Sequence, residues 1–115
     1  MALLDHENLD VYHCSIEFLT LALRLIARLP RGERELRDQL KRAAMSVPLN
    51  IAEGSGKPAA PDGARFYAIA RGSAMECGAL MDVCRVAGFL SVAEAEDTKT
   101  LLGRIVAMLT RMCRG

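Results

Sequence analysis

Aromatic residues are scarce in this sequence, which has no tryptophan, three phenylalanines and two tyrosines among its 115 residues. Residues that favour strands never gather into the alternating runs that predict a half-buried β-strand. Alanine, leucine, methionine and arginine dominate instead, and all four are good helix formers. Because this length suffices for one hydrophobic core and not for two, we expect a single all-α domain over residues 1–115.

Long apolar runs are also missing, and none approaches the length that spans a membrane. The first ten residues carry three acids, Asp5, Glu7 and Asp10, and lack the basic start and apolar core of a signal peptide. We therefore expect a cytoplasmic protein that has no membrane partner.

The four cysteines, Cys14, Cys77, Cys84 and Cys113, show none of the C-x-x-C spacings of zinc or redox sites. Each lies in an apolar helical pattern, so we expect reduced thiols that pack as small core hydrophobes. The alternative is a metal site that joins His13 to one or two cysteines, but its ligands would have to converge from three helices. We expect no metal and no cofactor.

The run Gly54-Ser55-Gly56-Lys57 is glycine-rich and ends in lysine, as a phosphate-binding loop does. A loop of the G-x-x-x-x-G-K-S/T type needs a glycine and a hydroxyl where this sequence has Ile51 and Pro58, and it should follow a strand. We therefore interpret Gly54 and Gly56 as a left-handed cap that ends a helix, with Pro58 preventing its continuation.

Apolar residues recur with helical spacing in four segments, the first from about Leu9 to Leu29. Pro30 ends this helix, and a second follows the Pro30-Arg31-Gly32 turn. Pro48 lies inside the second helix and removes the hydrogen bond to the Ala44 carbonyl, so we expect the helix to bend or restart there. The second helix is predicted to bury the following apolar residues: Leu36, Leu40, Ala43, Ala44, Val47, Leu49, Ile51 and Ala52.

The third helix is expected to begin with Pro61 in its first turn and to end at Gly88. Ser91 and Glu94 fit a capping box that opens a fourth helix reaching Met112. Because the connections are short, we predict an antiparallel, up-down-up-down four-helix bundle. The third helix is predicted to bury this stripe: Phe66, Ile69, Ala70, Ser73, Cys77, Leu80, Cys84 and Ala87.

The hydrophobic share of 51% is more than a domain of this size can bury alone, so we expect a homo-oligomer. Ala74, Gly78 and Met81 lie on a face of the third helix away from its main stripe. We expect this face to pack closely against another subunit.

Two polar pairs flank apolar positions, Asn50 with Glu53 and Ser73 with Glu76. We interpret all four as a structural network whose members satisfy one another and the carbonyl that Pro48 leaves without a donor.

An alternative interpretation is a small hydrolase or metal enzyme that uses Glu53, Glu76 and a histidine. A di-iron site in a bundle needs Glu-x-x-His motifs, whereas the only histidines here are His6 and His13. We therefore expect no catalytic residues and no enzymatic activity.

The net charge of +1 hides an uneven distribution of basic residues. Residues 24–42 hold seven bases against three acids, and residues 98–115 hold four bases and no acid. No aromatic residues lie between the bases, so any nucleic acid would be bound through its phosphates, with little sequence preference. Two stripes at helical spacing are the candidate nucleic-acid-binding residues: Arg24, Arg28 and Arg31, then Arg34, Arg37 and Lys41.

Three stretches, LDVYHCSIEF, DQLKRAAMSVPLNIAEGSGK and RFYAIARGSAMECGAL, resemble the four-helix-bundle family named for the intervening-sequence proteins of bacterial 23S ribosomal RNA genes. The most specific similarity runs from Gln39 to Gly54 and from Phe66 to Glu76. The resemblance implies a homo-oligomer without catalytic activity. It favours a pentamer, because the accessory protein of diversity-generating retroelements is similar to this family and forms a pentameric, nucleic-acid-binding barrel.

Two hypotheses follow. The first is a non-enzymatic oligomeric bundle that binds RNA or a ribonucleoprotein through its basic helix faces. The second is a structural or adaptor oligomer whose partner is another protein, and the near-neutral net charge favours it because the retroelement protein is strongly basic.

Overall fold

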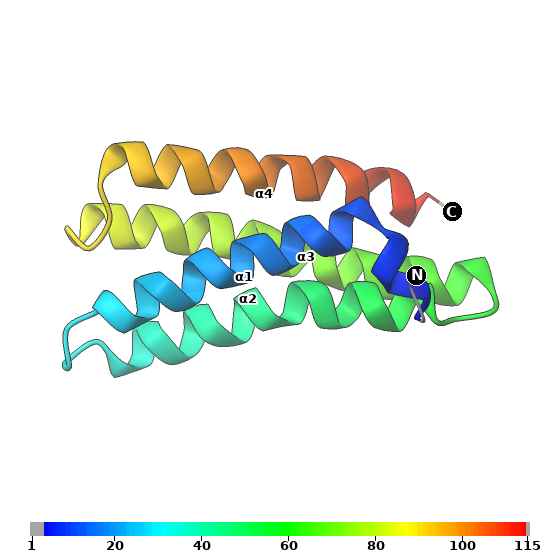
Figure 1. Cartoon of the computed structure of the whole chain (residues 1–115), viewed down its shortest axis with the longest axis horizontal. Helices are drawn as coiled ribbons and strands as arrows, with labels where there is room; N and C mark the ends of the chain where they lie inside the picture. The colour runs from blue at the N-terminus through cyan, green and yellow to red at the C-terminus, as the bar shows by residue number, and fades with distance from the viewer. Residues whose placement is uncertain (1–3, 115) are drawn as a thin grey trace.

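The computed structural model of the chain describes residues 4–114, which contain helices and no strand. Four long helices pack together, and a short 3-10 helix precedes them (Figure 1). The helices are η1 (Asp5–Asn8), α1 (Asp10–Arg28), α2 (Arg34–Ser55), α3 (Ala60–Val86) and α4 (Val92–Cys113). The prediction of an all-α bundle is therefore confirmed.

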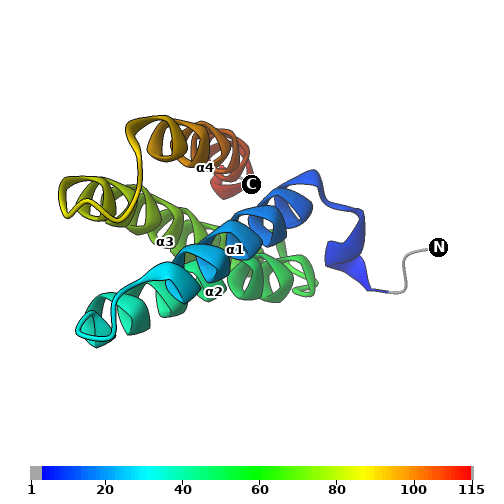
Figure 2. The ribbon, with the colours of Figure 1, turned by 60° about the vertical axis from the view of Figure 1, so that its left-hand side comes forward.

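Each long helix packs against two others, which gives the bundle its corners. α2 and α4 both pack on α3, and α1 packs on α2 and α4. Within residues 4–114 the backbones of α1 and α3 make no close approach, so these two helices occupy diagonal corners (Figure 2).

Local sequence signals set the ends of α3 and α4 as expected. The amide of Glu94 donates to Oγ of Ser91, and the amide of Ser91 donates to Oε1 of Glu94. Both distances are 3.1 Å, and the two hydrogen bonds complete the capping box. Pro61 lies in the first turn of α3. Gly88 follows α3 with a φ of +85°, the one positive φ between residues 4 and 114, and glycine adopts this conformation without strain.

α2 continues through Pro48 as one helix, without a restart, and ends at Ser55 with Gly56 as its C-cap. The expected left-handed cap is wrong, because Gly54 lies inside the helix and Gly56 has a φ of −84°.

Gly54 instead marks a close approach of α2 to α3. A methyl group at Gly54 would lie 2.6 Å from a ring carbon of Tyr67 and 2.9 Å from the carbonyl oxygen of Gly63. A methyl group at Gly63 would likewise lie 2.8 Å from the Gly54 carbonyl oxygen. Two glycines therefore let the helices touch backbone to backbone.

The core runs between the helices and is mainly aliphatic. Cys14, Cys77 and Cys84 are buried in it as free thiols, as predicted, whereas Cys113 is only partly buried. No helix in the described part of the chain is long and apolar enough to cross a membrane. The largest fully buried side chains include Phe18, Leu40, Ile51, Met81, Ile105 and Leu109.

Some of the predicted faces are wrong. Leu49 is 59% exposed and Ile69 is 48% exposed, although both were expected in the core. Ala74 and Met81, expected on the outer surface, are each only 1% exposed. The reason is that α3 packs on both α2 and α4, so it buries a wider arc than a single stripe and one shifted toward α4. Ala87 is also exposed, because it lies at the end of α3.

Candidate functional site

Of the four polar residues predicted to form one network, Asn50 and Ser73 are joined through Ser46, whereas the two glutamates make other contacts. Asn50 Nδ2 donates to the carbonyl oxygen of Ser46 at 2.9 Å and to its hydroxyl at 3.0 Å. The hydroxyl of Ser46 in turn lies 2.7 Å from that of Ser73, which joins α2 to α3. Asn50 therefore serves the Ser46 carbonyl, and not the Ala44 carbonyl that lacks the Pro48 donor.

The two carboxylates lie elsewhere on the surface. Glu53 is exposed and pairs with Lys57 one turn later, with 3.1 Å between Oε2 and Nζ. Glu76 accepts a long hydrogen bond of 3.4 Å from Gln39 Nε2. Among residues 4–114, no three His, Cys, Asp or Glu side chains converge in a way that could hold a metal ion.

Both histidines make contacts at the amino-terminal end of α1. Nε2 of His13 lies 2.7 Å from the carbonyl oxygen of Glu7, and the ring of His6 meets that of Tyr12 edge-on with centroids 4.5 Å apart. These contacts hold η1 against α1. Within residues 4–114 no hydrogen bond, ion pair or ring contact joins a histidine to Glu53 or Glu76.

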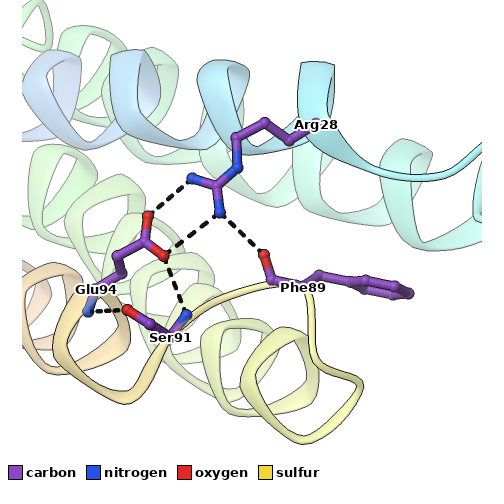
Figure 3. A network of polar contacts seen from close by, with 4 residues as sticks. All are labelled: Arg28, Phe89, Ser91 and Glu94. Carbon is purple, nitrogen blue, oxygen red and sulfur yellow. Dashed lines mark hydrogen bonds and ion pairs between the residues drawn. The ribbon is translucent and has the colours of Figure 1, made fainter.

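Arg28, one of the six candidate bases, is engaged with the start of α4 (Figure 3). Nη1 donates to Oε2 of Glu94 at 2.8 Å, and Nη2 donates to Oε1 at 3.4 Å and to the Phe89 carbonyl at 3.2 Å. The Arg28 guanidinium and the Ser91 amide together lower the pKa of the Glu94 carboxyl to about 2. Arg28 therefore links α1 to α4, and much of its hydrogen-bonding capacity is used.

The other candidate bases differ in what they contact. Arg37 Nη2 donates to the Pro30 carbonyl at 3.1 Å, which ties α2 to the preceding connection. The remaining four are exposed and have no hydrogen-bond or ion-pair partner among residues 4–114: Arg24, Arg31, Arg34 and Lys41.

The structure does not place the predicted bases on one surface. Arg24 and Arg28 line a groove of about 260 Å³ between α1 and α4, whereas Arg34 lines a cleft of about 560 Å³ beside α2 and α3. That cleft has mixed charge, since a second arginine and three acids share its walls. Its lining residues are Gly32, Arg34, Glu35, Asp38, Gln39, Arg42 and Glu76.

Sequence reasoning missed the residues that join distant segments. Ser46 has no local signal, because its role depends on Ser73 in the next helix. Nε of Arg71 donates to the Thr110 hydroxyl at 2.8 Å and so fastens α3 to α4. The capping box identified Glu94, but its partner Arg28 lies 66 residues away in sequence.

A family model described as 23S rRNA-intervening sequence protein matches residues 7–111. The chain belongs to this family. The match includes all of α1, α2 and α3 and nearly all of α4, so the resemblance seen in the sequence is confirmed. A search among curated proteins found no match.

The structure explains the two stretches that carried the family resemblance, residues 39–54 and 66–76. They face each other across α2 and α3, where Gln39 contacts Glu76, Ser46 contacts Ser73, and Gly54 lies against Tyr67. These two stretches therefore meet in one helix–helix contact.

Proposed function

We propose that this member of the family is a non-enzymatic, antiparallel up-down-up-down bundle that assembles as a homo-oligomer and binds RNA or a ribonucleoprotein in the cytoplasm. The order of contacts supports the antiparallel arrangement. Residues late in α2 lie beside residues early in α3, as Gly54 does with Gly63, and Asp82 late in α3 pairs with Lys99 early in α4 over 2.8 Å.

One observation carries the RNA proposal. Arg31, Arg34 and Lys41 are exposed, and no described side chain neutralises them. They lie in or near the connection between α1 and α2, and an oligomer would repeat them around its surface. Unpaired cations repeated in this way attract a polyanion and exchange its condensed counterions. The family description, 23S rRNA-intervening sequence protein, associates the family with a ribosomal RNA gene.

Binding of a single-stranded RNA oligonucleotide, followed by fluorescence anisotropy over a series of salt concentrations, tests the proposal. Each phosphate contact adds about 0.7 to the slope of log affinity against log salt on single strands. We expect the combined change of Arg31, Arg34 and Lys41 to alanine to flatten this slope by up to about 2.

The matched control removes three other bases, by changing Arg42, Arg104 and Arg111 to alanine. Light scattering must show that both variants keep the mass of the parent. If the two variants lose affinity equally, net charge alone governs binding and the named residues have no special role.

The adaptor alternative is favoured by the net charge of +1, and by Glu35, Asp38 and Glu76 around the cleft beside α2 and α3. Acids at this position repel phosphates. If the parent protein does not bind RNA at low salt, the adaptor function takes the place of RNA binding, and the oligomer is left to be tested by itself.

A further inference from the structure

α3 is unusual because its outward side is nearly as apolar as its buried side. Between Ala68 and Val86 only three exposed side chains are charged, Glu76, Asp82 and Arg85. Met75 is 55% exposed and Val86 is 76% exposed. We define the α3 outer face as the exposed apolar and small residues Ala68, Ile69, Gly72, Met75, Ala79, Val83 and Val86.

A helix that is apolar on all sides is normally covered on all sides. The α3 outer face also has the spacing of a packing seam, because Ala68, Gly72, Met75 and Ala79 follow one another at intervals of four, three and four residues. Beside this seam a groove of about 400 Å³ opens between α3 and α4, with Gly78 and Gly103 in its wall. Small residues at these positions leave room for bulky side chains from outside.

α1 carries a second exposed seam at the same intervals of four, three and four residues. We define the α1 outer face as Ile16, Thr20, Leu23 and Ala27, all of them exposed. The Thr20 hydroxyl donates to the Ile16 carbonyl at 3.0 Å, so its hydrogen is already used within the helix. The α1 outer face is therefore effectively uncharged and presents two large side chains, Ile16 and Leu23.

The two faces point away from each other, because α1 and α3 lie at diagonal corners of the bundle (Figure 2). We propose that the α1 outer face of one copy packs on the α3 outer face of the next. This inference rests on the homo-oligomer proposed above and specifies how its subunits touch. Contacts of this heterologous kind close into a ring when the rotation between copies permits it.

Size and charge both favour this pairing over contacts between two like faces. The bulky Ile16 and Leu23 match the small Gly72 and Ala79 and the groove beside them. On α1 the acid precedes the base, Glu17 before Arg24, whereas on α3 the base precedes the acid, Arg65 before Glu76. All four of these charged side chains are exposed.

In an up-down-up-down bundle α1 and α3 run in the same direction. Rotation about an axis along the helices keeps that direction from copy to copy. Neighbouring copies would therefore bring opposite charges together at both ends of the contact.

Two substitutions test the two faces separately, Leu23→Arg on α1 and Gly72→Arg on α3. Neither should disturb the monomer, because Leu23 is 42% exposed and a methyl group at Gly72 would meet no atom within 4 Å. The matched controls are Leu49→Arg, on the exposed side of α2, and Gly32→Arg, which also points into open space. Circular dichroism shows whether each variant keeps the parent's helical content and melting temperature.

The decisive experiment mixes the two face variants and measures mass by light scattering, at a concentration well above that at which the parent assembles. Alone, each variant should have the monomer mass of 12.5 kDa, whereas both controls keep the parent's mass. Mixed in equal amounts, Leu23→Arg supplies an intact α3 outer face and Gly72→Arg supplies an intact α1 outer face. The mixture should therefore give a heterodimer of twice the monomer mass and nothing larger.

Each other outcome has a distinct meaning. A parent that is monomeric refutes the proposed oligomer, and this inference with it. If the parent is oligomeric but either variant keeps the parent's mass, the face assignment is wrong while the oligomer stands. If each variant alone forms a dimer, its remaining face pairs with its own kind and the heterologous contact is refuted. The heterologous contact is refuted equally if both variants and their mixture are monomeric.

Discussion

Replacing Gly54 with alanine should destabilise the fold, although alanine is the better helix former. Gly54 lies inside α2, where the change by itself favours the helix by about 1 kcal/mol. The added methyl group would lie 2.6 Å from a ring carbon of Tyr67 and 2.9 Å from the Gly63 carbonyl oxygen. The ring can rotate away, but the carbonyl belongs to the backbone of α3, so the two helices must move apart.

Overpacking of a close contact costs about 1 to 3 kcal/mol, and a clash with backbone belongs at the upper end of that range. After subtraction of the helix gain, we expect Gly54→Ala to lower the free energy of unfolding by about 2 kcal/mol. The melting temperature should fall by about 8 °C, because each kcal/mol corresponds to about 4 °C for a domain of this size.

The control is Gly103→Ala in the middle of α4, where a methyl group would meet no atom of the same subunit within 4 Å. Because Gly103 borders the groove assigned to a neighbouring copy, both changes are made in the Leu23→Arg variant, which is expected to be monomeric. Gly103→Ala should raise the stability of that variant by about 0.5 to 1 kcal/mol. Urea denaturation followed by far-UV circular dichroism, at one fixed protein concentration, measures both. The reasoning is refuted if Gly54→Ala is as stable as Gly103→Ala, because a methyl group would then fit between α2 and α3 without steric cost.

Three further predictions concern single contacts. Asn50→Ala should lower the free energy of unfolding by about 1 kcal/mol, because the Ser46 hydroxyl and carbonyl lose the donor on the Asn50 side chain. Glu53→Ala removes only an exposed ion pair and should cost less than about 0.5 kcal/mol, so equal costs in urea denaturation would contradict the different environments of the two residues. The pKa of the Glu94 carboxyl is about 2 against an ordinary 4.5, so its contribution to stability is complete above pH 4.5 and is lost as the pH falls toward 2. Carboxyl NMR should show this pKa, and a pKa that does not rise in Arg28→Ala would rule out the Arg28 contact as its main cause. Burial raises the pKa of the Cys77 thiol to about 12, so a thiol reagent at neutral pH should label Cys113 well before Cys77. Peptide mass spectrometry measures both labelling rates, and equal rates would mean that the core opens easily.

The local sequence is sufficient to determine where helices form and end. The capping box at Ser91, the proline in the first turn of α3 and the glycine at 88 each act through groups only a few residues away, so the chain needs no distant partner to specify them. The family resemblance was recognisable for a related reason. Each side of the α2–α3 contact is one continuous stretch of residues, so both sides are visible in the sequence.

Tertiary packing decided what local signals could not. Gly54 has the flanking residues of a helix cap, and only the approach of Gly63 and Tyr67 makes it a packing residue. Asn50 and Glu53 look alike as polar neighbours, yet the position of Ser46 beside α3 gives Asn50 a partly buried hydrogen bond and leaves Glu53 on the surface. In the sequence Arg28 belongs to a basic stripe, and only the fold shows that it pairs with Glu94. Helical periodicity indicates which residues share a face, but the identity of the neighbouring helix depends on contacts between segments far apart in the chain, and these exist only once the bundle has formed.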